Sequence, residues 1–502
     1  MHLKRLAALL SIGAILAALP AFGQTLRIGL AEDPDVLDPT LARTFVGRIV
    51  FAAVCDKLFD LDEKLNIVPQ LATSYQWSPD YKSLTLKIRQ GVTFHDGEKL
   101  DAAAVKYNLE RHKTMPGSTR RGELASVATI DVVDPYTVKL NLSQPFAPLL
   151  AVLTDRAGMM VSPKAAKAEG EKFGAHPVCS GPFKFVERVA QGRISFERYA
   201  GYWNKGAIHF DKVYYEPIPD SQVRLANLKS GQLDLIERFA PSDIAGLKTD
   251  SRFKISKIVE IGYQGITINL GKSDLAAKSV LKDPRVREAL ELSIDRDGVV
   301  QVAQEGEGVA GNQWVAPTSS WYAKNLPIPK RDVNRARALL KEAGVTNPTF
   351  NLMTPTTSDA QRFAQVVQAM VKEAGFDAKI VSTEFSTSLD MADKGQYEAY
   401  VLAWSGRADP DGNLQSHLGC KQPLNYAGYC NAEVDDWIAK SRSTGDRAER
   451  QKYYDLIAAQ VLKDRPIIYV YHRHWLWAYT NKVSGLRTVP DGLIRLQDLK
   501  MN

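Results

Sequence analysis

Segments with the residue pattern of a β-strand alternate along this chain with segments of helical pattern. Apolar residues recur at helical spacing in segments 221–229, 285–294, 333–342, 359–373 and 447–462. Short strand patterns separate them at 265–269, 349–353, 377–382, 399–403 and 467–471. This alternation is typical of α/β domains. Because 502 residues exceed what one hydrophobic core usually holds, we expect two or three domains.

The N-terminal segment, residues 1–23, has the pattern of a secretory signal peptide. Lys4 and Arg5 precede an apolar run over 6–19, and small residues at Ala21 and Gly23 favour cleavage before Gln24. A membrane anchor is the alternative, but the run is short for a span, and no later segment offers the roughly 18 apolar residues that a span needs. We therefore expect an exported, soluble mature chain.

The formal net charge is +7, and basic residues are interleaved with acidic ones along the whole chain. This distribution argues against a nucleic-acid partner, which would require a basic stripe or patch.

Four cysteines follow the predicted cleavage point, and export permits disulfides. Cys420 and Cys430 flank the polar loop "CKQPLNYAGYC", which predicts a disulfide between them. For Cys55 and Cys179, two buried thiols and a disulfide remain equally open. The absence of a Cys-x-x-Cys pair or a Cys/His cluster argues against a zinc or redox site, and we predict no cofactor.

Three short motifs suggest chemistry but favour structural interpretations. His95 and Asp96 in "FHDG" lack a nucleophile-and-base set and read as a turn. "YHRH", 471–474, reads as a strand end with exposed polar residues rather than a metal pair. "DPDGN", 409–413, lacks the glycine and glutamate positions of an EF-hand. We therefore predict no catalytic residue and no metal ligand.

The segment "LAWSGRADPDGN" places polar residues directly after the predicted strand 399–403. Ligands of α/β folds commonly lie at the carboxyl ends of strands or between domains. This loop is therefore where a ligand is expected.

Several stretches, in this order, resemble one family. They are "PQLATSYQWSPDYKSLTLKIRQGVTFHDGEKLDAAAVKYNLER", "SGPFKF", "FERYAGYWNKGAIHFDKVYYEPIPD", "LANLKSGQLDLI", "DPRVREALELSIDRDGVV", "RARALLKEAG" and "RPIIYVYHRHWLWAY". The family is that of the periplasmic solute-binding proteins of ABC importers for dipeptides, oligopeptides and nickel complexes, solute-binding family 5. The resemblance covers nearly the whole mature chain.

The resemblance implies an α/β fold of two lobes joined by a hinge, with an extra domain inserted in lobe one. The domains expected after the signal peptide are lobe one at 24–49, 180–263 and 480–502, the inserted domain at 50–179, and lobe two at 264–479.

The resemblance also implies ligand-binding residues, with one departure from the pattern. Peptide-binding relatives carry an aspartate shortly after the loop tryptophan to hold the α-amino group, whereas this chain has Arg407 there. An arginine favours an acidic ligand group. In an alternative alignment, Asp409 takes the aspartate's role. Further pocket residues expected from the resemblance are Arg43, Thr44, Ser180, Gly181, Asn269, Trp321 and Trp404.

These expectations describe a monomeric periplasmic binding protein that is not an enzyme. It captures a peptide-like or opine-like solute with an acidic group and delivers it to an ABC permease in the inner membrane. Carriage of a metal complex or a sugar-containing solute is the alternative within the class. A secreted hydrolase is the alternative from another class, although no G-x-S-x-G motif is present.

Overall fold

The computed structural model describes residues 24–271 and 273–502. The predicted signal peptide, residues 1–23, lies outside the described residues. In the part of the chain that is described, no helix is both long enough and apolar enough to cross a membrane.

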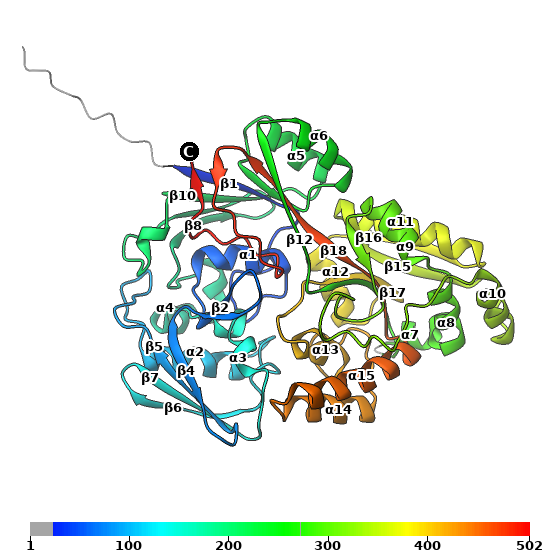
Figure 1. The fold of residues 1–502 in the computed structure, drawn as a ribbon, viewed down its shortest axis with the longest axis horizontal. Coiled ribbons are helices and arrows are strands. Elements are labelled where there is room, and N and C mark those ends of the chain that lie inside the picture. Colours follow the sequence, from blue (N-terminus) through cyan, green and yellow to red (C-terminus); the bar gives the residue numbers. More distant parts are fainter. Residues whose placement is uncertain (1–23, 272) are drawn as a thin grey trace, which may run out of the picture.

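A large mixed sheet runs through the molecule and joins two lobes (Figure 1). Its strands follow the order β16-β15-β17-β13-β18-β11-β1-β10-β9-β8, and β12 and β14 also pair with β18. Lobe one is built on β1 (Thr25–Leu30), β8 (Phe183–Val189), β9 (Arg193–Arg198), β10 (Lys212–Pro217), β11 (Leu235–Glu237) and β12 (Phe253–Val259). Lobe two is built on β13 (Tyr263–Ile268), β14 (Gly308–Ala310), β15 (Thr349–Pro355), β16 (Asp377–Thr383) and β17 (Ala399–Trp404).

The long strand β18 (Ile467–Thr480) belongs to both lobes. Its first residues pair with β13 in lobe two, and residues 474–480 pair with β12 in lobe one. The short segment between β12 and β13 crosses in the same region. The chain therefore passes between the lobes at two neighbouring places, which form the hinge.

The prediction that "YHRH" ends a strand with exposed polar residues is wrong, because β18 continues to Thr480. His472 is fully buried, and its Nδ1 lies 2.6 Å from the carbonyl oxygen of Gly262. His472, Arg473 and His474 all contact partners that are distant in the sequence.

The strands of lobe two are apolar on both faces because helices cover both sides of the sheet. On β17, Val401 faces one apolar core, whereas Tyr400, Leu402 and Trp404 face the other. The helices of this lobe are α7 (Asp274–Lys278), α8 (Pro284–Leu292), α9 (Arg296–Gln304), α10 (Val333–Glu342), α11 (Ser358–Glu373), α12 (Phe385–Asp393), α13 (Asp411–Leu418), α14 (Ala432–Arg442) and α15 (Arg447–Asp464).

A second, antiparallel sheet lies beside lobe one and has its own apolar core (Figure 1). Its strands are β4 (Ala72–Trp77), β5 (Ser83–Ile88), β7 (Thr137–Leu142) and β6 (Val127–Asp134), in that order. Helix α2 (Ala102–Thr114) packs on this sheet and begins after Asp101, whose side chain accepts a hydrogen bond from the Ala104 amide. The short helices α3 (Leu149–Val152) and α4 (Pro163–Glu169) complete this part of the chain. The remaining helices of lobe one are α1 (Phe45–Val54), α5 (Ser221–Lys229) and α6 (Ile244–Thr249).

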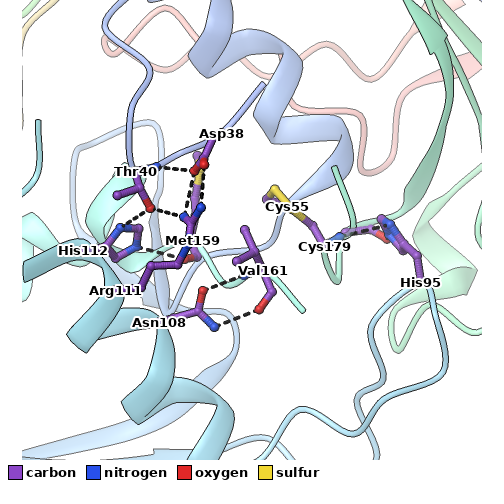
Figure 2. Close-up of a disulfide and its surroundings, with 11 residues drawn as sticks. Asp38, Thr40, Cys55, His95, Asn108, Arg111, His112, Met159, Val161 and Cys179 are labelled. Atoms are coloured by element: carbon purple, nitrogen blue, oxygen red, sulfur yellow. Dashed lines mark hydrogen bonds and ion pairs between the residues drawn. A yellow bond between two sulfur atoms is a disulfide. The ribbon is translucent and has the colours of Figure 1, made fainter. Parts of the chain in front are cut away.

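Two disulfides are present. Cys55 is bonded to Cys179 across 124 residues, and Cys420 is bonded to Cys430 across 10 residues. The first pairing is one that the sequence left open. Figure 2 shows it next to His95, whose Nδ1 accepts from the Cys179 amide and whose Nε2 lies 3.0 Å from the Gly181 carbonyl oxygen. His95 of the "FHDG" motif therefore contributes to structure around this disulfide.

Candidate functional site

A cavity that opens to solvent lies where the chain crosses between the lobes. We call it the central cavity. Lobe one contributes Glu32, Arg43, Phe45 and Arg238, and lobe two contributes Asp359, Phe363, Phe385 and Trp404. The two crossings contribute Glu260, Gln264, Tyr471, Arg473 and Trp475. Since both lobes and the hinge line it, its shape depends on how the lobes are arranged.

Arg473 is at the centre of the ionic contacts in this cavity. Its Nη1 lies 2.6 Å from Asp359 Oδ2, and its amide donates to Glu260 Oε1 at 2.8 Å. Burial would raise the pKa of Asp359, but Arg473 and Arg238 outweigh it and hold that pKa well below its ordinary value. Asp359 is therefore ionised, and Arg473 links lobe two to the hinge.

Arg238 makes a matching set of contacts on the side of lobe one. Its Nη1 donates to Glu32 Oε1 at 2.9 Å, and its Nε donates to Glu237 Oε2 at 2.7 Å. Burial raises the pKa of Glu32, against the lowering effect of Arg238. Three arginines and three carboxyl groups therefore line the cavity: Arg43, Arg238, Arg473, Glu32, Glu260 and Asp359.

Aromatic rings form the apolar part of the wall. Phe45 and Trp475 stack with centroids 4.4 Å apart. The guanidinium of Arg238 lies 5.6 Å from the Phe45 ring centroid, and that of Arg473 lies 5.6 Å from the Trp475 ring centroid. These contacts hold both arginines against flat apolar surfaces.

The predicted residues Arg43 and Trp404 line the central cavity. Arg43 also joins the lobes, because its guanidinium lies 2.6 Å from Asp390 and 2.5 Å from Asp393 on α12. Thr44 is fully buried and caps α1, accepting from the Gly47 amide and donating to Asp35. It positions its neighbours and does not line the cavity.

Arg407 and Asp409 do not line the central cavity. They lie close to Trp404, which does. Arg407 packs over the Trp404 ring at 4.4 Å, and its Nε lies 3.4 Å from Asp155 Oδ2. Asp409 accepts two hydrogen bonds from Arg450, at 2.9 and 2.6 Å. Both residues line a second space of about 480 Å³ that shares Trp404 with the central cavity.

Four other predicted site residues lie outside the central cavity. Ser180 and Gly181 adjoin the Cys55–Cys179 disulfide, and the Gly181 amide donates to the Val54 carbonyl oxygen. Asn269 is buried and donates to the carbonyl oxygens of Gly395 and Tyr397. Trp321 packs on Tyr454 and Arg447 beside a separate surface cleft.

Sequence reasoning missed Glu32, Arg238, Glu260, Asp359 and Arg473. The available signal was their position: Glu260 directly follows a strand, and Arg473 lies within one. Charged residues in otherwise apolar strand segments require partners, but the sequence does not say which residues these are.

Glu260 gives the cavity a measurable pH dependence. Burial, only partly opposed by Arg473, raises its pKa from 4.5 to about 7. The folded protein thus keeps a proton that the unfolded chain releases, so this stabilisation is complete below pH 4.5 and is lost as the pH rises to about 7. In Glu260→Gln this dependence is absent. Urea unfolding at several pH values should show the stability difference between wild type and variant changing by about 3 kcal/mol over that window. A constant difference would contradict the proposed protonation.

Comparison with known proteins places this arrangement among binding proteins. Residues 66–425 match the family described as "Bacterial extracellular solute-binding proteins, family 5 Middle". The glutathione-binding protein GsiB of Shigella dysenteriae serotype 1 (strain Sd197) is 28% identical over 510 residues, which cover 99% of this chain and 98% of GsiB.

Solved structures share the fold. The PBP AgaA from A. tumefacien R10 in complex with agropinic acid has a TM-score of 0.86 and 27% identity, covering 95% of this chain and 99% of AgaA. The dipeptide binding protein from Pseudoalteromonas sp. SM9913 in complex with Met-Leu has a TM-score of 0.88 and 21% identity, covering 95% of this chain and 100% of that protein. The second likeness bears on the fold alone.

Proposed function

Because this chain belongs to the family 5 bacterial extracellular solute-binding proteins, we propose that it captures a peptide-like or opine-like solute between its lobes. It is the periplasmic substrate-binding component of an ABC importer, acts as a monomer, and delivers the solute to the membrane permease. The relatives include a glutathione-binding protein and a periplasmic binding protein in complex with agropinic acid, which supports a small organic solute with ionised groups.

The observation that carries the proposal is the presence of both cationic and acidic side chains in the central cavity. Arg43, Arg238 and Arg473 suit a ligand carboxylate, and Glu32, Glu260 and Asp359 suit an ammonium group. A solute with both groups offers an additional ionic partner to both sets, whereas a neutral solute offers none. This chemistry favours a zwitterion with at least one acidic group.

The apolar lining of the central cavity supports the same class. Phe45, Phe385 and Trp404 supply apolar contact for the part of the solute between its charged ends. A ligand that contacts both lobes stabilises the closed arrangement of the lobes, which is the form that the permease recognises.

A screen of matched solutes tests the proposal. Short peptides and opines are compared with their N-acetyl and methyl ester derivatives by thermal shift and calorimetry. At least one free zwitterion is expected to raise the melting temperature, and blocking either end is expected to weaken its binding about tenfold or more, since each removes a charge-assisted contact.

Two outcomes would count against the proposal. Binding of neutral sugars in preference to every zwitterion would point to the alternative solute class. Recovery of a chemically altered solute after incubation would point to a hydrolase.

A further inference from the structure

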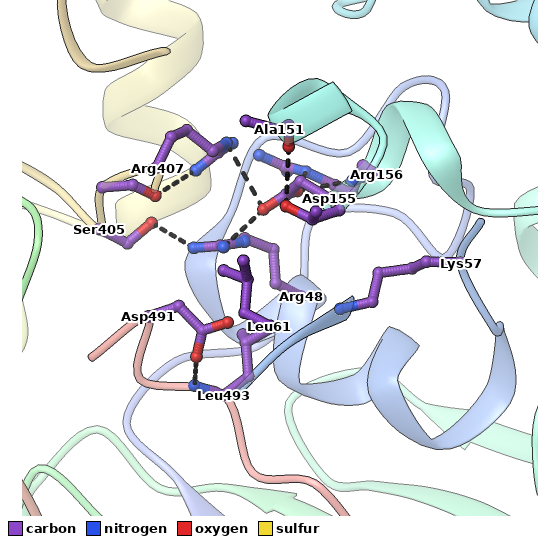
Figure 3. A network of polar contacts seen from close by, with 12 residues as sticks. Arg48, Lys57, Leu61, Ala151, Asp155, Arg156, Ser405, Arg407, Asp491 and Leu493 are labelled. Atoms are coloured by element: carbon purple, nitrogen blue, oxygen red, sulfur yellow. Dashed lines mark hydrogen bonds and ion pairs between the residues drawn. The ribbon is translucent and has the colours of Figure 1, made fainter. Parts of the chain in front are cut away.

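Four arginines, three of them buried, meet where lobe two contacts the chain between α2 and α4. Arg48 comes from α1, Arg407 follows β17, Arg156 follows α3, and Arg120 follows α2. We call these residues the arginine cluster. Figure 3 shows three of them, Arg48, Arg156 and Arg407, around Asp155.

Asp155 is the shared carboxylate of this cluster. Its Oδ2 lies 2.5 Å from Arg48 Nη2 and 3.4 Å from Arg407 Nε, and its Oδ1 lies 3.4 Å from Arg156 Nε. Only 4% of its side chain is exposed. Arg120 is paired separately with Glu123.

The positive charge of the cluster is not balanced. Four guanidinium groups face the two carboxylates of Asp155 and Glu123, an excess of two charges. The nearby carboxylates are already paired: Asp409 with Arg450, Asp411 with Arg442, and Asp491 with Arg495. Buried positive charge without compensation is costly, and an anion offsets that cost.

Buried guanidinium N–H groups without a hydrogen-bond acceptor also favour an anion at this cluster. Arg48 Nε and Arg407 Nη2 are buried and have no hydrogen-bond partner among the described residues, and Arg156 Nε forms only its ionic contact with Asp155. Burial lowers the pKa of Arg407 to about 10, and the attraction of Asp155 opposes this while Arg48 adds to it. Burial and the neighbouring arginines also lower the pKa of Arg156.

The cluster adjoins the central cavity. Ser405 lines that cavity and accepts a hydrogen bond from Arg48 Nη1 at 2.9 Å. On the other side of Trp404, Arg407 lines the second space of about 480 Å³ together with Glu123, Ala151 and Val152. The central cavity and the second space therefore share Trp404, and the arginine cluster adjoins both.

We propose that the arginine cluster is an anion subsite that takes a carboxylate of the bound solute, with Asp155 as an internal carboxylate that holds the arginines in place. This inference rests on the proposed function and adds to it, because it assigns the solute a second acidic group, separate from the one at Arg238 and Arg473. Asp155 then also sets specificity, since it limits how much negative charge the subsite accepts.

Malonate, a small dicarboxylate, serves as the probe. Thermal unfolding is followed while malonate replaces chloride at constant ionic strength. Wild type is expected to show a saturable rise in melting temperature, and Arg407→Gln is expected to require about tenfold more malonate, since it loses a charge-assisted contact. Asp155→Asn removes a competing negative charge, so it is expected to respond at lower malonate concentrations than wild type. Arg335→Gln, at an exposed pair with Glu342, is the control and should respond like wild type.

The opposite directions of the two variants make the test decisive. An equal response of wild type and Arg407→Gln, or a weaker response of Asp155→Asn, would overturn the subsite. If Arg407→Gln does not fold, the malonate response of Asp155→Asn compared with that of wild type is sufficient to test the subsite. Malonate binding without any zwitterion binding in the central cavity would overturn the proposed function and leave the subsite standing.

Discussion

Replacing Cys55 and Cys179 together by alanine is expected to lower the free energy of unfolding by about 5 kcal/mol, more than any other change considered for this chain. The disulfide closes a segment of 124 residues, so its removal releases a large loop entropy to the unfolded state. The same replacement at Cys420 and Cys430, which are 10 residues apart, is expected to lower it by about 3 kcal/mol.

Urea unfolding of the two double-alanine variants measures this difference. The midpoint of the Cys55→Ala/Cys179→Ala variant should lie below that of the Cys420→Ala/Cys430→Ala variant. The reverse order would show that local packing around Cys420 and Cys430, rather than loop length, dominates their contribution.

Arg473→Ala is expected to lower the free energy of unfolding by about 3–5 kcal/mol and to abolish solute binding. The substitution leaves the buried Asp359 carboxylate without its closest cation and removes the link between lobe two and the hinge. Arg335→Ala is the matched control, because its pair with Glu342 is about half exposed and should contribute at most about 1 kcal/mol.

A triple variant separates stability from binding. In Arg473→Met with Glu260→Gln and Asp359→Asn, no charge of this group remains unpaired, so much of the lost stability is expected to return. Binding is not expected to return, because the groups proposed to contact the solute are gone. Recovery of binding in this variant would remove Arg473 from the site.

Element types were predictable because local pattern decides them. The helices at 221–229 and 333–342 have the bounds that apolar spacing predicts. The length of β18 was not predictable, since "YHRHWLW" contains polar residues that normally end a buried strand. In the folded chain His472 contacts Gly262, and Arg473 contacts Glu260 and Asp359. These partners lie more than 100 residues away in sequence, as the separations of Arg473 from Asp359 and Glu260 show.

The same reason limits prediction of the site. The loop after β17 was identified from its place at a strand end, and Trp404 does line the central cavity. Arg407, however, meets Asp155 from a distant segment, and Arg43 meets Asp390 and Asp393 on α12. Whether an arginine is available to a ligand depends on such partners, which only the folded chain brings together.

The central claim is that a small zwitterionic solute with acidic groups lies enclosed between the lobes. Native mass spectrometry of the protein, isolated from the cell envelope without unfolding, tests this most directly. We predict one solute per chain, released only on denaturation, whose fragments contain an amine and at least two carboxylates. A chain that carries a solute lacking carboxylates, or that carries none and takes up none from the periplasmic extract, would contradict the account.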